Sequence, residues 1–92
     1  YATQTPLFLG MKPQENSEQT LQILLQDDPK IAAPKMILSE RGSLVEAAQN
    51  LYAVLHLADQ KGLQRIYVET FPDEGLGAAM NDRLNRAAAK FQ

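Results

Sequence analysis

The clearest pattern of hydrophobic and polar positions lies between residues 43 and 61. Apolar side chains recur there at intervals of three and four, which is the spacing of one buried helix face. Ser43 followed by Glu46 has the form of a capping box, and Gly62 stands where a helix C-cap belongs. We therefore expect a helix over residues 43–61. Its buried positions would be Leu44, Ala48, Leu51, Leu55 and Ala58.

A second helical pattern occupies the C-terminal part of the chain, from about Gly75 to Phe91. Its apolar residues also follow helical spacing, which predicts that one face of this helix is buried. The positions concerned are Leu76, Met80, Leu84, Ala87, Ala88 and Phe91.

Three short apolar runs predict strands over residues 5–10, 35–40 and 65–71. The first run has Pro6 near its start and Gly10 at its end, which is typical of a short buried strand. The third run is rich in β-branched and aromatic residues, which favour strands. All three are too short for helices and are followed by turn or loop residues.

The segment from Thr20 to Gln26 fits two structures. Leu21, Leu24 and Leu25 suit one face of a helix, whereas the same run could equally form a buried strand. Two parallel strands need a crossover of about a dozen residues, and residues 17–28 supply one. We therefore favour a helix and keep the strand as the alternative.

Strands that alternate with helices predict an α/β fold with a small parallel sheet in two or three layers. The sheet would have three strands, or four if residues 20–26 form one. About three helices would cover one or both of its faces.

Composition indicates one globular domain and excludes several kinds of chemistry. The chain has 92 residues and a net charge of −2, which gives no general attraction for nucleic acid or for an anionic membrane. There is no cysteine, so thiolate nucleophiles and cysteine zinc sites are excluded, and His56 is the one imidazole. No apolar run approaches the roughly 20 residues that span a bilayer. Because the chain starts at Tyr1, we expect it to be part of a longer protein.

Three stretches of the chain resemble one family as a set. The first is Tyr1-Ala2 followed by Thr5-Pro6-Leu7, and the second is LYAVLHLAD at residues 51–59. The third and most specific is PDEGLGAAMNDRL at residues 72–84. Together they resemble the C-terminal accessory domain of the two-domain L-threonylcarbamoyladenylate (threonylcarbamoyl-AMP) synthases of the Sua-five type.

The resemblance implies a Rossmann-like domain over residues 5–92, with residues 1–4 as the end of an interdomain linker. This domain would be non-catalytic and would anchor the linker, and it would support or gate a YrdC-like catalytic domain elsewhere in the parent chain. The parent enzyme would be a cytoplasmic nucleotidyltransferase that uses ATP and magnesium in tRNA threonylcarbamoyladenosine modification. This chain alone would hold no catalytic residue, cofactor or metal.

The chain departs from the family pattern at two motif positions and in its middle part. His56 stands where the family's helix motif typically has Arg, and Thr3 stands where its linker motif typically has Pro. The stretch between Gly10 and Glu40 is shorter than the family pattern and carries no matching motif.

The loop after the third strand is the main candidate site. It joins a strand end to a helix start, where open α/β sheets usually bind ligands. Asp73 and Glu74 put negative charge at the positive end of the helix, so they would repel a phosphate, and helix capping explains them better. We expect this loop and its neighbours to form an interdomain docking surface. Its residues would be Glu69, Pro72, Asp73, Glu74, Gly75, Gly77 and Asn81.

Three weaker candidates remain in the sequence. A parallel sheet would gather Glu40 and Glu69 with Asp73 and Glu74 at one edge, where they could hold magnesium or a basic segment. His56 lies away from the apolar stripe, so we expect it to be a surface group. A stripe of cations on the last helix could make a weak contact with RNA phosphates. These cations are Arg83, Arg86 and Lys90.

The alternative to the accessory-domain hypothesis is a free-standing α/β module. Such a module would bind a nucleotide or small metabolite at the carboxyl ends of its strands. A well-formed pocket at that edge would favour it.

Overall fold

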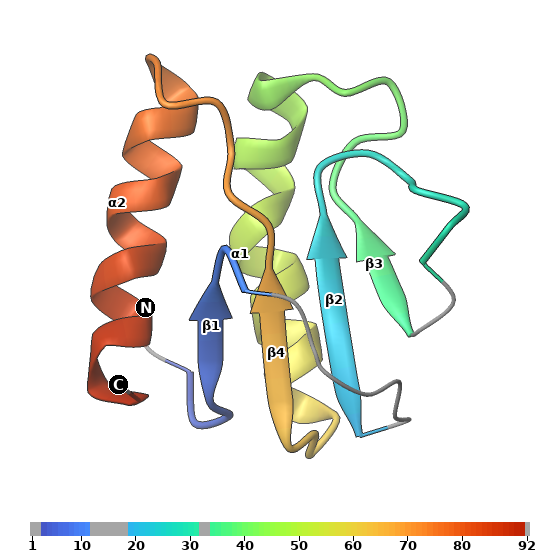
Figure 1. The fold of residues 1–92 in the computed structure, drawn as a ribbon, viewed down its shortest axis with the longest axis vertical. Coiled ribbons are helices and arrows are strands. Elements are labelled where there is room, and N and C mark those ends of the chain that lie inside the picture. The colour runs from blue at the N-terminus through green and yellow to red at the C-terminus, as the bar shows by residue number, and fades with distance from the viewer. Residues whose placement is uncertain (1–2, 12–18, 32–33, 92) are drawn as a thin grey trace.

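The computed structural model describes residues 3–11, 19–31 and 34–91, and it is built around one parallel sheet. The four strands have the order β1-β4-β2-β3. They comprise β1 (Leu7–Leu9), β2 (Thr20–Leu24), β3 (Lys35–Ile37) and β4 (Arg65–Val68). Every neighbouring pair is parallel, so the carboxyl ends of all four strands lie at the same edge (Figure 1).

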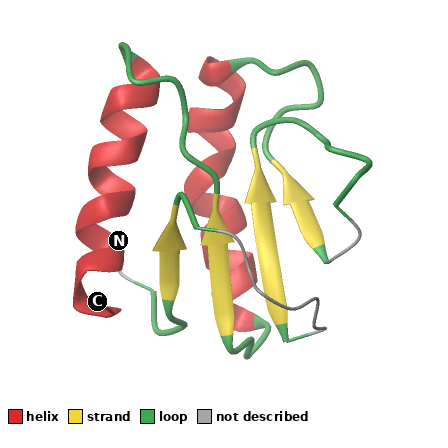
Figure 2. Ribbon diagram, in the orientation of Figure 1, coloured by secondary structure: helices red, strands yellow, loops and turns green. Residues whose placement is uncertain are grey.

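Two α-helices form the second layer: α1 (Leu44–Gln60) and α2 (Leu76–Ala88), the latter followed by a 3-10 turn at Ala89–Phe91. The buried faces of both helices contribute to the same apolar cluster against the sheet. Figure 2 shows the two helices in red and the strands in yellow. The fold is therefore the predicted α/β class in its two-layer form. It has four parallel strands and two α-helices in the described part of the chain, where we expected about three helices.

The segment from Thr20 to Gln26 is where the favoured prediction was wrong. It contains strand β2, which pairs with β4 on one side and β3 on the other, and all five of its residues are buried. Its apolar run fits both periodicities, so the long-range pairing and the burial decide the outcome. The helix expected over residues 17–28 is therefore absent from the described residues, and residues 17 and 18 lie outside them.

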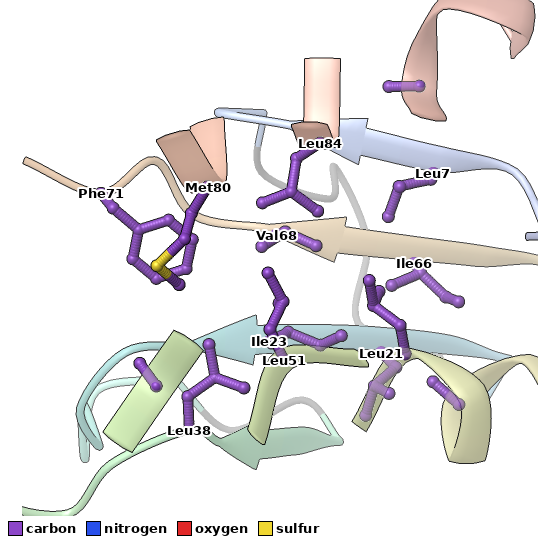
Figure 3. Close-up of a cluster of buried hydrophobic side chains, with 14 residues drawn as sticks. Leu7, Leu21, Ile23, Leu38, Leu51, Ile66, Val68, Phe71, Met80 and Leu84 are labelled. Carbon is purple, nitrogen blue, oxygen red and sulfur yellow. The ribbon is translucent and has the colours of Figure 1, made fainter. Parts of the chain in front are cut away.

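The core lies between the sheet and the helices. Side chains of a strand alternate between its two faces, so Ile66 and Val68 of β4 face the helices while Tyr67 faces the opposite side. Ile66 and Val68 are completely buried, and Leu84 of α2 and Leu51 of α1 pack into the same cluster (Figure 3). Most of the apolar positions that predicted the two helices thus cover the sheet, but Leu76, which we expected to be buried, is 44% exposed.

The start of α1 matches the predicted capping only in part. The hydroxyl of Ser43 accepts a hydrogen bond from the backbone N–H of Glu46, at 3.2 Å. The carboxylate of Glu46 does not complete the box, because it pairs with Arg41 at 3.3 Å. The backbone N–H of Ser43 instead donates to the hydroxyl of Ser39, at 2.9 Å.

The connection from β4 to α2 is held by close backbone packing. Gly77 is buried, and a Cβ atom placed on it would lie 1.8 Å from the carbonyl oxygen of Pro72. The side chain of Asn81 makes two hydrogen bonds to the backbone of Phe71: its oxygen accepts from the N–H at 2.9 Å, and its amide donates to the carbonyl at 2.8 Å. The N-cap of α2 is Gly75, which makes no side-chain capping hydrogen bond, so the capping expected from Asp73 and Glu74 is not made at this position.

Replacing Gly77 with alanine should destabilise the fold strongly, because the new methyl group would overlap the Pro72 carbonyl. We expect a loss of about 3 kcal/mol or more in unfolding free energy, in the upper range for single substitutions. Gly62→Ala is the matched control, because Gly62 has φ of +68° with nothing within 4 Å of the added Cβ. It should cost only the left-handed backbone strain, about 1–2 kcal/mol. Urea unfolding measures both, and equal losses would contradict the steric argument.

Candidate functional site

The N-terminal end of the described chain is tied to the last turn of α1 by one carboxylate. Asp59 accepts hydrogen bonds from the backbone N–H of Thr5 at 2.8 Å and from that of Gln4, whose nitrogen lies 3.1 Å from each carboxylate oxygen. A carboxylate that accepts backbone N–H groups makes charge-assisted hydrogen bonds, which are stronger than neutral ones. Asp59 is therefore an anchor that joins residues far apart in the sequence.

Thr3 reinforces this anchor. It is fully buried although it precedes the first strand, and its hydroxyl donates to the carbonyl oxygen of Thr5 at 2.8 Å. We define Thr3, Gln4, Thr5 and Asp59 as the anchor. Sequence reasoning did not single out Asp59 as a binding residue, although it ends the helix motif at residues 51–59. Tyr1 and Ala2 lie outside the described residues.

The predicted docking surface separates into structural and exposed residues. Gly77 and Asn81 hold the β4–α2 connection, as described above. Glu69 accepts a hydrogen bond from the backbone N–H of Leu25 at 2.5 Å, so it ties the end of β4 to the end of β2. The four remaining residues are exposed at the turn before α2. They are Pro72, Asp73, Glu74 and Gly75.

An apolar groove continues from that turn along the two helices. Leu76 is 44% exposed and Tyr52 is 39% exposed, and both line a groove between α1 and α2 with Ala48 and Ala79. Arg83 crosses the groove and donates a hydrogen bond to the Tyr52 hydroxyl at 2.8 Å. We call these five residues the interhelical groove.

The three cations of the predicted basic stripe each have a partner within the chain. The hydrogen bond to Tyr52 raises the pKa of Arg83 above its ordinary value, so this side chain stays charged. Arg86 pairs with Asp82 at 3.1 Å, and the Lys90 ammonium lies 4.9 Å from the centre of the Phe91 ring. An RNA contact by this stripe stays a prediction.

The acidic residues that might have held magnesium do not gather in the described part of the chain. Within those residues, no group of three or more His, Asp or Glu side chains is placed to hold a metal ion. The Glu69 carboxylate accepts a hydrogen bond from the Leu25 N–H, while Asp73 and Glu74 are exposed at the turn before α2. His56 is an exposed group that contacts Gln60 of the same helix, with 3.2 Å between the two nitrogens.

A cavity of about 260 Å³ lies at the carboxyl ends of β1, β2 and β4. Gln22 and Tyr67 contribute to its lining from the strands, Gly10 from the residue after β1, and Asp28 from the segment after β2. This is the edge where the alternative hypothesis places a ligand. Of the predicted docking-surface residues, Glu69 lines this cavity, whereas the exposed turn at Pro72–Gly75 does not.

Among the helices that the structure describes, none has the length and apolar character needed to cross a membrane.

Comparison with known proteins gives one match. No curated protein and no solved structure matches this chain. A family model described as "Threonylcarbamoyl-AMP synthase, C-terminal domain" matches residues 1–89, which is nearly the whole sequence and includes all three stretches that carry the resemblance. The chain therefore belongs to the family of threonylcarbamoyl-AMP synthase C-terminal domains.

Proposed function

We propose that this chain is the non-catalytic accessory domain of a cytoplasmic threonylcarbamoyl-AMP synthase, and that it holds the linker to a YrdC-like catalytic domain. The observation that carries the proposal is the anchor. Asp59 fixes the backbone of Gln4, the last residue of the proposed linker, and of Thr5, which follows it. A fixed attachment point restricts where the linker and the domain beyond it can move.

The anchor can restrain the linker because Asp59 lies on helix α1, which is packed against the sheet. Leu55, one helical turn before Asp59, is 2% exposed and belongs to the core. The position of the carboxylate therefore depends on the same packing that holds α1 on the sheet. Linker restraint of this kind would limit opening of a neighbouring catalytic cleft, which is a common way of gating product release.

We further propose that the interhelical groove and the turn at Pro72–Gly75 receive the catalytic domain. The anchored residues lie against α1, so the linker reaches this domain on the helix side of the sheet. The groove lies on that side, and its lining includes Tyr52, Leu76 and one arginine, of which the aromatic residue and the arginine are types enriched at interfaces. The exposed carboxylates of Asp73 and Glu74 beside it would suit basic residues at the rim of the partner.

The chemistry of the parent enzyme would reside in the catalytic domain. That domain would bind ATP and magnesium and join threonine and bicarbonate to AMP with release of pyrophosphate, for tRNA modification. The described residues of this chain contribute no metal-binding group of three or more acidic or histidine side chains. The isolated chain should therefore form no threonylcarbamoyl-AMP, and product formation by the chain alone would refute the proposal.

Asp59→Ala in the synthase that carries this domain should release the linker. The lost carboxylate leaves two backbone N–H groups without their partner, which costs about 1.5–3 kcal/mol for hydrogen bonds to a charged group. We expect faster amide hydrogen exchange at Gln4 and Thr5 and a several-fold change in the rate of product formation. Asp82→Ala, which removes only a surface pair with Arg86, is the control and should change neither. Faster exchange with an unchanged rate would show that the anchor has no role in the reaction.

Leu76→Ser tests the docking surface separately. The residue is exposed, so the substitution should leave the unfolding temperature of this domain nearly unchanged while weakening contact with the catalytic domain. Leu57→Ser is the matched control, because Leu57 is 51% exposed on α1 but does not line the groove. We expect Leu76→Ser alone to lower the synthase rate and to increase protease cleavage between the domains. Equal effects of the two substitutions would exclude the groove as the docking surface.

A further inference from the structure

A larger cavity continues the interhelical groove toward the C-terminal ends of the two helices. It has a volume of about 430 Å³, and its lining includes Arg86 and Ala87 of α2. The cavity at the groove itself has a volume of about 150 Å³. Leu51, Tyr52 and Arg83 line both cavities, so the two are parts of one depression between α1 and α2. We call the larger one the C-terminal cavity, the smaller one the groove cavity, and both together the interhelical depression.

The spacing of the two cavities suits the side chains of a helix. The α2 residues that line only the C-terminal cavity lie about seven positions after those that line only the groove cavity, which is roughly 11 Å along the helix axis. Helical residues seven positions apart lie about 10.5 Å apart on one face. Side chains on one face of a strand recur about every 6.7 Å, so pairs about 6.7 or 13 Å apart fit this distance less well.

The charges at the two ends of the depression are opposite. Both helices follow strands of a parallel sheet, so both begin at its carboxyl edge and run in the same direction (Figure 1). Asp73 and Glu74 are exposed at the end where α2 begins, whereas Arg86 is exposed in its last turn. Arg86 pairs with Asp82, but an exposed pair is weak, and a guanidinium has five N–H donors for further partners.

The same surface is a poorer match for RNA. Leu76 is 44% exposed and Tyr52 is 39% exposed, and such apolar and aromatic area is typical of a protein partner. RNA carries a phosphate charge at every nucleotide, so the carboxylates of Asp73 and Glu74 would repel it at one end of the depression.

We propose that the interhelical depression receives an amphipathic helix of the catalytic domain, antiparallel to α1 and α2. This inference rests on the proposed function, which assigns the groove to that domain. Two large apolar side chains seven residues apart would enter the two cavities, with a small residue between them over the Tyr52–Arg83 hydrogen bond. The partner helix would carry Asp or Glu in its first turn, opposite Arg86. Its last turn would carry Lys or Arg, opposite Asp73 and Glu74.

Helix dipoles favour the same orientation. Acidic residues in the first turn and basic residues in the last turn stabilise a helix, so the partner can satisfy the depression and its own dipole together. An antiparallel helix also places its positive N-terminal end beside the negative C-terminal ends of α1 and α2. The charge order of the depression therefore selects one direction of the partner.

Two helical peptides with opposite charge order test this direction on the unmodified chain. Each has 13 residues, the length of α2, with two leucines seven residues apart and alanine between them. One has glutamates in the first turn and lysines in the last, the other has the reverse order, and lactam bridges on the far face keep both helical. Calorimetry should show at least tenfold tighter binding of the first peptide, with NMR shifts at the amides of Ala48, Ala79 and Ala87. The preference should shrink in about 1 M salt, where the Debye length is about 3 Å.

Three results of this experiment would overturn the proposal. The first is equal binding of the two peptides, and the second is binding of neither at millimolar concentration, whether or not the chain instead dimerises through this face. The third is an oligouridine RNA that shifts the same amides while neither peptide does.

Arg86→Gln tests the positive end of the depression. It should reduce the preference for the first peptide by about threefold, as expected for an exposed ion pair. Arg65→Gln is the matched control, because Arg65 is an exposed arginine at the start of β4 that lines neither cavity, and it should leave the preference unchanged. Equal effects of the two substitutions would contradict the proposed position of the acidic first turn.

The synthase separates failure of this inference from failure of the proposed function. Arg86→Gln should increase protease cleavage between the domains, as we expect for Leu76→Ser. If Leu76→Ser increases cleavage but Arg86→Gln does not, and both peptides bind alike, the groove still receives the catalytic domain and the inferred charge order is wrong. If neither substitution changes cleavage, the proposed docking surface itself is wrong.

Discussion

The pairing of β4 with β1 on one side and β2 on the other is the interaction on which the rest of the structure depends. It sets Ile66 and Val68 toward the helices, where they form the centre of the core. The same alternation turns Tyr67 to the opposite face, beside Gln22. One strand register thus determines both the core and the cavity. A slip of one residue would exchange the two faces.

Helix α1 couples this core to the N-terminal segment. Its buried stripe includes Leu51 and Leu55, and Asp59 follows one turn later with its carboxylate on the backbone of Gln4 and Thr5. The attachment of the preceding chain therefore shares its support with the sheet.

The β4–α2 connection was predicted as a binding surface, but some of its residues are needed to hold the fold. Gly77 is required because Pro72 packs against its backbone, and Asn81 satisfies the backbone of Phe71 at the end of the sheet. These contacts fix the conformation of the turn before α2. The exposed residues beside them, among them Leu76, are then presented in one arrangement, which is what a docking surface requires.

The sequence by itself determined the two helices, three of the four strands and the family, because each rests on local spacing or on contiguous motifs. It favoured a helix for residues 20–26, which was wrong, because a short apolar run also fits a buried strand and only pairing with β3 and β4 made it one. The anchor joins positions 55 residues apart, and the cavity brings Gln22 beside Tyr67. No local pattern records such contacts, because strand register and helix packing create them only when the whole chain folds.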